Sequence, residues 1–201
     1  MTSNLSVIVL AAGRSRRMGR TKPLLPLGDK TVLQQVLTAL CEVNPARILV
    51  VLGSEGGPIA DGLGDYAVSI LWNPARDSEM ADSLRCALPA LPPEDHGVMI
   101  CLGDQPLIAP ATYRTLSEQY LSRPGAIVQP QNGGRKGHPV LLPRALLEEI
   151  RTRATLRDLL AAHAARVQLV EVADPGILQD IDTPQDYQRA LHLWARAHGR
   201  V

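Results

Sequence analysis

Short, continuous apolar runs recur along the chain, and each is followed by glycine, proline, asparagine or charged residues. Such runs are typical of strands that are buried on both faces of a parallel sheet. On this basis we predict strands at residues 5–10, 46–52, 66–72, 98–102, 126–129, 138–142 and 167–172.

Between these runs the apolar residues follow helical spacing. Thr31 is placed to cap a helix that continues to Leu40, and Thr183 combines with Pro184 and Asp186 in a capping-box pattern that starts the last helix. Further helices are predicted at 79–91, 110–122, 144–150 and 155–163. The alternation of strands and helices predicts a three-layer α/β/α fold with a mostly parallel, Rossmann-like sheet. With no internal repeat or linker in the sequence, we expect one domain spanning residues 1–201.

Composition limits the possible partners. A net charge of +1 argues against a nucleic-acid-binding protein that relies on bulk charge. Three cysteines without a CxxC spacing suggest neither a disulfide framework nor a zinc site. The polar start does not resemble a signal peptide, and the apolar run after it is too short to span a membrane. We therefore expect a cytoplasmic protein without a membrane partner.

The first predicted strand leads through Ala11, Ala12 and Gly13 into a strongly cationic loop that carries Arg14, Arg16, Arg17, Arg20 and Lys22. The spacing is neither that of a Walker A motif nor GxGxxG. A generic solvated basic loop is the alternative, but the glycines, small residues and preceding strand favour a loop that directs cations at a triphosphate.

Acidic residues follow later elements. Asp104 comes directly after the strand at 98–102, while Asp180 and Asp182 precede the last helix. Each has a structural alternative, as a turn former or as a complement to the helix dipole. Their functional interpretation is Mg²⁺ binding, for which Asp182 is preferred to Asp180 because it is adjacent to the helix cap.

A glycine-rich segment, residues 133–137, separates two predicted strands. It is equally compatible with a plain hairpin turn and with a loop in which Arg135 or Lys136 meets an anionic acceptor. His138 lies between glycine and proline, where a structural position is favoured over a catalytic role.

Taken together, four motifs resemble the molybdenum cofactor cytidylyltransferases. The motifs are the opening run from Leu10 to Pro26, Leu-Gly-Asp-Gln-Pro at 102–106, Gly-His-Pro-Val-Leu at 137–141 and Asp-Ile-Asp-Thr-Pro at 180–184. That family belongs to the nucleotidyltransferases with a GT-A-like fold, whose largely parallel sheet has one reversed strand. The resemblance implies transfer of CMP from CTP to molybdopterin cofactor with release of pyrophosphate, and a client molybdoenzyme.

The resemblance also implies roles for individual residues. The nucleotide-binding set is Leu10, Ala11, Ala12, Gly13, Arg16, Arg17, Lys22, Asn73, Ser83 and Asp104. Catalysis is expected from Arg17, Lys22 and Asp104, with Mg²⁺ held by Asp104 and Asp182. Acceptor binding is expected from Gln105, Arg135, Lys136 and His138.

One region departs from the family pattern. Glu79 stands where relatives have glycine and Asp82 where they have serine, which brings negative charge to the expected base region. An acid suits a base that presents N–H donors, such as guanine or the cytosine amino group, while the methyl group of Ala12 favours a pyrimidine. The alternatives are a guanylyl or sugar-phosphate nucleotidyltransferase, an NAD(P)-dependent reductase of similar fold, and a non-catalytic chaperone for the cofactor.

Overall fold

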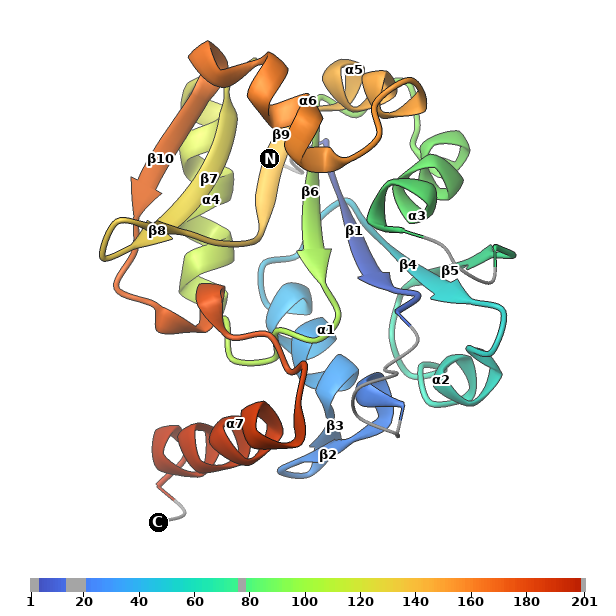
Figure 1. Ribbon diagram of the computed structural model, residues 1–201, viewed down its shortest axis with the longest axis vertical. Coiled ribbons are helices and arrows are strands. Elements are labelled where there is room, and N and C mark those ends of the chain that lie inside the picture. Colours follow the sequence, from blue (N-terminus) through green and yellow to red (C-terminus); the bar gives the residue numbers. More distant parts are fainter. Residues whose placement is uncertain (1–3, 14–20, 76–78, 200–201) are drawn as a thin grey trace.

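The computed structural model describes residues 4–13, 21–75 and 79–199. Its central sheet has the strand order β10-β7-β9-β6-β1-β4-β5, with the short β8 paired to β7 (Figure 1). The strands are β1 (Leu5–Ala11), β4 (Arg47–Gly53), β5 (Ser69–Asn73), β6 (Gly97–Leu102), β7 (Ile127–Asn132), β8 (Arg135–Lys136), β9 (Val140–Pro143) and β10 (Val167–Glu171). Every predicted strand is therefore present.

The sheet is mostly parallel, and β1 lies at its centre. Ile8 of β1 is in register with Leu49 of β4 on one side and with Ile100 of β6 on the other, both in parallel pairing. Strand β9 runs antiparallel to both β6 and β7. The predicted mostly parallel sheet with a reversed strand, β9, is confirmed, and the two-residue β8 adds a further antiparallel pairing with β7.

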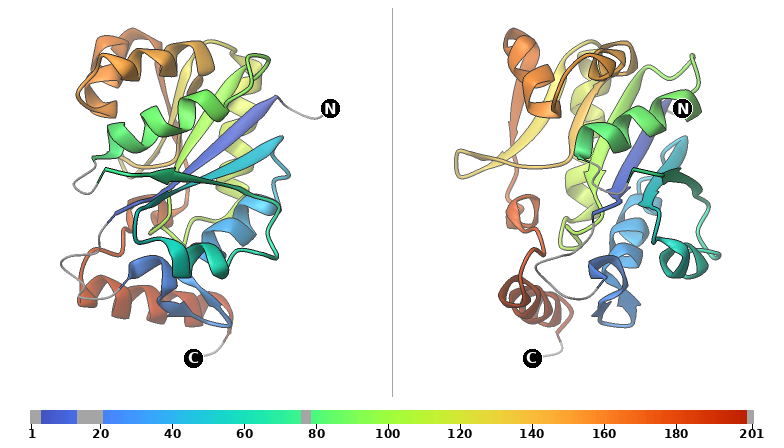
Figure 2. Two further views of the ribbon diagram at one scale, coloured as in Figure 1. Left: turned by 90° about the vertical axis from the view of Figure 1, so that its right-hand side faces the viewer. Right: turned by 45° about the vertical axis from the view of Figure 1, so that its right-hand side comes forward.

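Helices cover both faces of the sheet, which gives the three predicted layers (Figure 2). One face packs against α1 (Val32–Cys41), α2 (Gly57–Asp61) and α4 (Pro110–Ser122). The other packs against α3 (Met80–Ala87), α5 (Arg144–Leu147) and α6 (Leu156–Ala162). Because both faces are covered, the central strands are apolar throughout, as the continuous runs in the sequence indicated.

A smaller apolar cluster joins residues 25–32 to the C-terminal helix. Helix α7 (Pro184–Ala197) packs on the hairpin formed by β2 (Pro26–Leu27) and β3 (Lys30–Thr31), with Leu27 and Trp194 among the buried residues. This hairpin was not predicted from the sequence, because strands of two residues are too short to show an alternating pattern.

Short 3₁₀ turns complete several elements: η1 (Lys22–Leu24), η2 (Leu88–Ala90), η3 (Glu148–Arg151), η4 (Ala164–Arg166) and η5 (Pro175–Leu178). Thus the helix predicted at 79–91 ends at Ala87 and continues as a 3₁₀ turn that contains Pro89. The predicted caps are confirmed, since Thr31 and Thr183 each accept a hydrogen bond from the backbone three residues on. Over the described residues, no helix is both long and apolar enough to cross a membrane.

Candidate active site

The carboxyl ends of β1 and β6 lie side by side and form the floor of the candidate site. The Gly103 N–H donates to the Leu10 carbonyl at 2.9 Å. A β-carbon on Gly103 would lie 3.0 Å from the β-carbon of Ala11, so small residues are required for this close approach. The ligand-binding edge of an open α/β sheet is formed in this way by strand ends and the loops that follow them.

Lys22 lies between two carboxylates from distant parts of the sequence. Its Nζ is 3.2 Å from Asp104 Oδ2 and 2.6 Å from Asp182 Oδ1. Asp104 follows β6, and Asp182 precedes α7. The two segments are joined by a hydrogen bond of 3.0 Å from the Ile181 N–H to the Asp104 carbonyl. The capping box of Thr183 and Asp186 fixes the chain directly after Asp182.

The pKa values of this cluster report a strong mutual interaction. Burial alone would lower the pKa of Lys22, but the hydrogen bond and charge of Asp182 and the charge of Asp104 outweigh burial and raise it. The pKa of Asp104 is raised, first by burial and then by the charges of Asp180 and Asp182, although Lys22 opposes the shift. A site that gathers carboxylates in this way favours a cation.

A pocket of about 230 Å³ opens beside this cluster. Its lining includes most of the expected nucleotide-binding residues, namely Leu10, Ala11, Ala12, Gly13, Lys22, Ser83 and Asp104, together with Asp180. We call it the small pocket. Asn73 lies behind it, buried, and donates to Ser83 Oγ at 3.1 Å. Asn73 therefore positions Ser83. The expected residues Arg16 and Arg17 lie outside the described residues.

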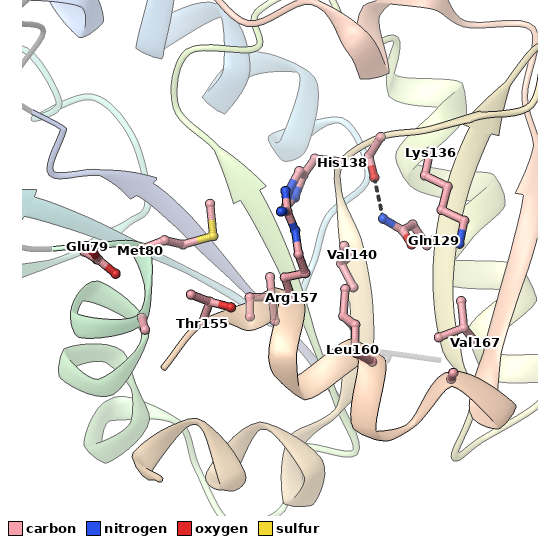
Figure 3. A pocket seen from close by; sticks show the side chains of 15 residues that line it. Glu79, Met80, Gln129, Lys136, His138, Val140, Thr155, Arg157, Leu160 and Val167 are labelled. Carbon is pink, nitrogen blue, oxygen red and sulfur yellow. Dashed lines mark hydrogen bonds between the residues drawn. The ribbon is translucent and has the colours of Figure 1, made fainter. Parts of the chain in front are cut away.

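A second pocket, of about 760 Å³, adjoins the small one. We call it the large pocket. Glu79 and Met80, at the start of α3, line both pockets and form their shared wall. Of the expected acceptor-binding residues, Lys136 and His138 line the large pocket (Figure 3). Arg157 of α6 lines it too, and no motif in the sequence predicted this position.

Other expected residues lie elsewhere. Gln105 is buried, and its amide donates to the Ile177 carbonyl and to Asp180. Arg135 lines a separate polar cavity of about 290 Å³ together with Arg189, because neighbouring residues of the short strand β8 face opposite sides. The expected acceptor-binding set is thus divided between the large pocket, this polar cavity and the interior.

The two acids near the expected base region, Glu79 and Asp82, have different surroundings. Asp82 accepts hydrogen bonds from Arg85 at 2.6 Å and from the Glu79 N–H at 2.9 Å, so its charge is compensated locally. Glu79, by contrast, lines both pockets. Of the two departures from the family pattern, Glu79 is the one that faces the site.

His138 owes its position to a close backbone contact. A side chain on Gly137 would collide with the Ile177 carbonyl oxygen, and the His138 N–H donates to that same carbonyl at 3.3 Å. Burial lowers the pKa of His138, a shift that the Ile100 backbone and the charge of Asp180 oppose. His138 is therefore held neutral in the large pocket near pH 7.

The described residues contain no cluster of three or more His, Cys, Asp or Glu side chains suited to a metal ion. Asp104 and Asp182 nevertheless share one cation, the Lys22 ammonium group. A pair of carboxylates fits Mg²⁺ or Mn²⁺, because such ions take one or two protein carboxylates and complete their shell with phosphate oxygens and water.

Several known proteins are similar to this chain over much of its length. The molybdenum cofactor cytidylyltransferase of Escherichia coli is 28% identical over 191 residues, which cover 92% of this chain and 94% of the relative. The bifunctional protein GlmU of Halorhodospira halophila is 35% identical over 118 residues, 58% of this chain. That match spans only 24% of GlmU, about a quarter of its length.

A solved structure, Rv0371c of Mycobacterium tuberculosis in complex with manganese, superposes with a TM-score of 0.77 at 26% identity. The match covers 96% of this chain and 100% of that one. Residues 7–168 match the family model described as the MobA-like NTP transferase domain. Because this match covers well over half of the sequence, the chain belongs to the MobA-like NTP transferase family of nucleotidyltransferases.

Proposed function

We propose that the protein is a Mg²⁺-dependent nucleotidyltransferase that transfers CMP from CTP to molybdenum cofactor and releases pyrophosphate. The observation that carries the proposal is the convergence of Lys22, Asp104 and Asp182 beside the small pocket, with a larger pocket next to it. The near full-length similarity to the Escherichia coli cytidylyltransferase supports this choice of substrates.

The charges of the small pocket support a metal requirement. Its described lining carries one cation, Lys22, against the carboxylates of Glu79, Asp104 and Asp180. These acids would repel a triphosphate, and a bound divalent cation would offset them together with the arginines of residues 14–20, which lie outside the described residues. Asp104 and Asp182 would hold Mg²⁺, which when bound neutralises phosphate charge and supports departure of pyrophosphate.

The chain's own residues position the reactants. The backbone from Ala11 to Gly13 can approach the nucleotide closely, and Lys22 exchanges its carboxylate partners for phosphate oxygens. An oxygen of the acceptor phosphate forms a bond to the α-phosphorus of CTP. The bond from that phosphorus to the bridging oxygen breaks, and pyrophosphate leaves with the electron pair. Because the attacking phosphate is already an anion, positioning and charge neutralisation suffice and no general base is needed.

Glu79 supports cytosine as the base. Its side chain borders the small pocket beside Ser83, and a carboxylate accepts a hydrogen bond from an exocyclic amino group. Ala12, also in the lining, adds a methyl group that narrows the space for a purine.

The three cysteines are free, in keeping with the proposed cytoplasmic location.

A sugar-phosphate nucleotidyltransferase is the second candidate. The 35% identity with part of GlmU favours it, although that match covers 58% of this chain. The two candidates differ in the acceptor and share the same triphosphate chemistry.

A pyrophosphate-release assay separates these candidates. CTP, GTP, UTP and ATP are compared, each with molybdenum cofactor or with a hexose 1-phosphate. We expect release only with CTP and the cofactor in the presence of Mg²⁺. Asp104→Asn should reduce turnover by orders of magnitude while the circular dichroism spectrum is unchanged. Undiminished release by that variant, or release with the sugar phosphate alone, would contradict the proposal.

A further inference from the structure

The large pocket combines apolar walls with a cationic rim. Its apolar lining comes from α3, β9, α6 and β10 and includes Met80, Val140, Leu156, Leu160 and Val167. Its volume of about 760 Å³ is more than three times that of the small pocket, at about 230 Å³. Space and surface of this kind suit an extended ring system.

The charged groups of the lining favour an anion. Arg157 and Lys136 are cations, His138 is held neutral by its burial, and Glu79 on the shared wall is the one carboxylate among the described lining residues. Figure 3 shows Arg157 extending from α6 through the middle of the pocket toward His138, whereas Lys136 lies beside Gln129 on the other side of β9.

Arg157 differs from the arginines near it in having no side-chain partner among the described residues. Arg151 is paired with Glu148 at 2.9 Å, and Arg153 is paired with Glu149 at 3.2 Å. Within the described part of the chain, the Arg157 guanidinium group has no ion pair or side-chain hydrogen bond. Arg157 is exposed to solvent, so what distinguishes it is its place over the apolar cavity, where its planar fork can bind two phosphate oxygens at once.

We propose that Arg157 is a specificity-determining residue that binds the phosphate of the acceptor while the apolar walls hold its ring body. This inference rests on the proposed function, because it makes the large pocket the acceptor site. A fork that holds two phosphate oxygens leaves the third free to attack the nucleotide where the two pockets adjoin, at Glu79 and Met80.

Binding of 8-anilinonaphthalene-1-sulfonate tests the pocket without any assumption about the reaction, because this probe joins an anionic group to apolar rings. Fluorescence titration compares the wild type with Arg157→Ala, Arg157→Lys and Ala161→Trp. Ala161 is exposed and lines the pocket, so an indole there fills the cavity without entering the core. The matched control is Arg151→Ala, outside the pocket. We expect the dissociation constant of the probe to rise at least tenfold for Arg157→Ala and by an intermediate factor for Arg157→Lys. Ala161→Trp should not bind the probe, and the control should bind it like the wild type.

Steady-state kinetics give the second measurement. With molybdenum cofactor varied, Arg157→Ala should raise the acceptor KM at least tenfold and leave the KM for CTP within twofold. Unchanged probe binding by either Arg157→Ala or Ala161→Trp overturns the inference, as does a parallel rise in both KM values. If the wild type releases no pyrophosphate but the probe results are as expected, the proposed function fails and the pocket assignment stands for another anionic acceptor.

Discussion

Replacing Lys22 with methionine is expected to tighten the binding of Mn²⁺ to the nucleotide-free protein. In the structure the Lys22 ammonium group lies 2.6 Å from Asp182 and 3.2 Å from Asp104, so it occupies the carboxylates that a metal ion needs. A metal entering the free protein must displace this internal cation. Methionine has a similar length and no charge, so it removes the competitor.

The size of the effect follows from the two contacts. A hydrogen bond to a charged group contributes about 1.5–3 kcal/mol when it is shielded. The side chains of Asp104 and Asp182 are 27% and 37% exposed, so solvent screening reduces each contact to about 1 kcal/mol. Without Lys22, Mn²⁺ no longer has to displace contacts worth about 2 kcal/mol. This difference corresponds to roughly 30-fold tighter Mn²⁺ binding, since each 1.4 kcal/mol is a factor of ten.

Titration of Mn²⁺ followed by electron paramagnetic resonance measures the affinity directly, without turnover. Lys30→Met is the matched control, because Lys30 lies in the β2–β3 hairpin and lines neither pocket. The same Lys22 variant should melt at a lower temperature without metal and recover when Mn²⁺ is added. If Lys22→Met binds Mn²⁺ no more tightly than the wild type, the lysine and the metal do not share these carboxylates and the reasoning fails.

Three further predictions concern local structure. Burial lowers the pKa of His138 in the folded protein below its ordinary value of 6.5. The neutral imidazole therefore contributes to the stability of the fold above pH 6.5, and this contribution is lost as the pH falls below 6.5. Urea unfolding should therefore show a smaller loss of stability between pH 7 and 5 for His138→Gln, and a slope equal to that of the wild type would contradict this. Gly137→Ala should lower the free energy of unfolding by about 1–3 kcal/mol, because the added methyl group clashes with a backbone carbonyl. Gly64 has open space around it, so Gly64→Ala should unfold like the wild type. Equal stability of the two glycine variants would be evidence against the clash. Thr183→Ala should lower the free energy of unfolding by about 1 kcal/mol, because α7 loses its N-cap. An unchanged melting temperature would disprove that role.

Much of the fold could be predicted because both faces of the central sheet are covered. Burial on both sides makes β1, β4 and β6 continuous apolar runs, which are visible without a structure. Chain order then places Asp104 and the start of the cationic loop at one edge of the sheet. The reversed strand β9 begins at this edge, which is why His138 lies near them.

The large pocket could not be predicted in the same way. In the sequence Arg157 is one polar residue near the start of a short amphipathic helix, and its spacing matches a solvent-facing position. Only the packing of α6 against the sheet places it over a cavity. The compensation of Asp82 by Arg85 also depends on side-chain orientation at the start of α3, which residue types alone do not determine.

Glu79 and Met80 form a wall that the two pockets share, so a substitution at either residue changes both pockets. A substitution there that enlarges the space for a different base also reshapes the neighbouring cavity. Under the proposed function, a change at residue 79 or 80 therefore alters the nucleotide and acceptor sites together, and a variant library at these positions should be screened against pairs of substrates. Arg157 and Ala161 line the large pocket and not the small one, so under the proposed function changes there alter the acceptor preference and keep the nucleotide.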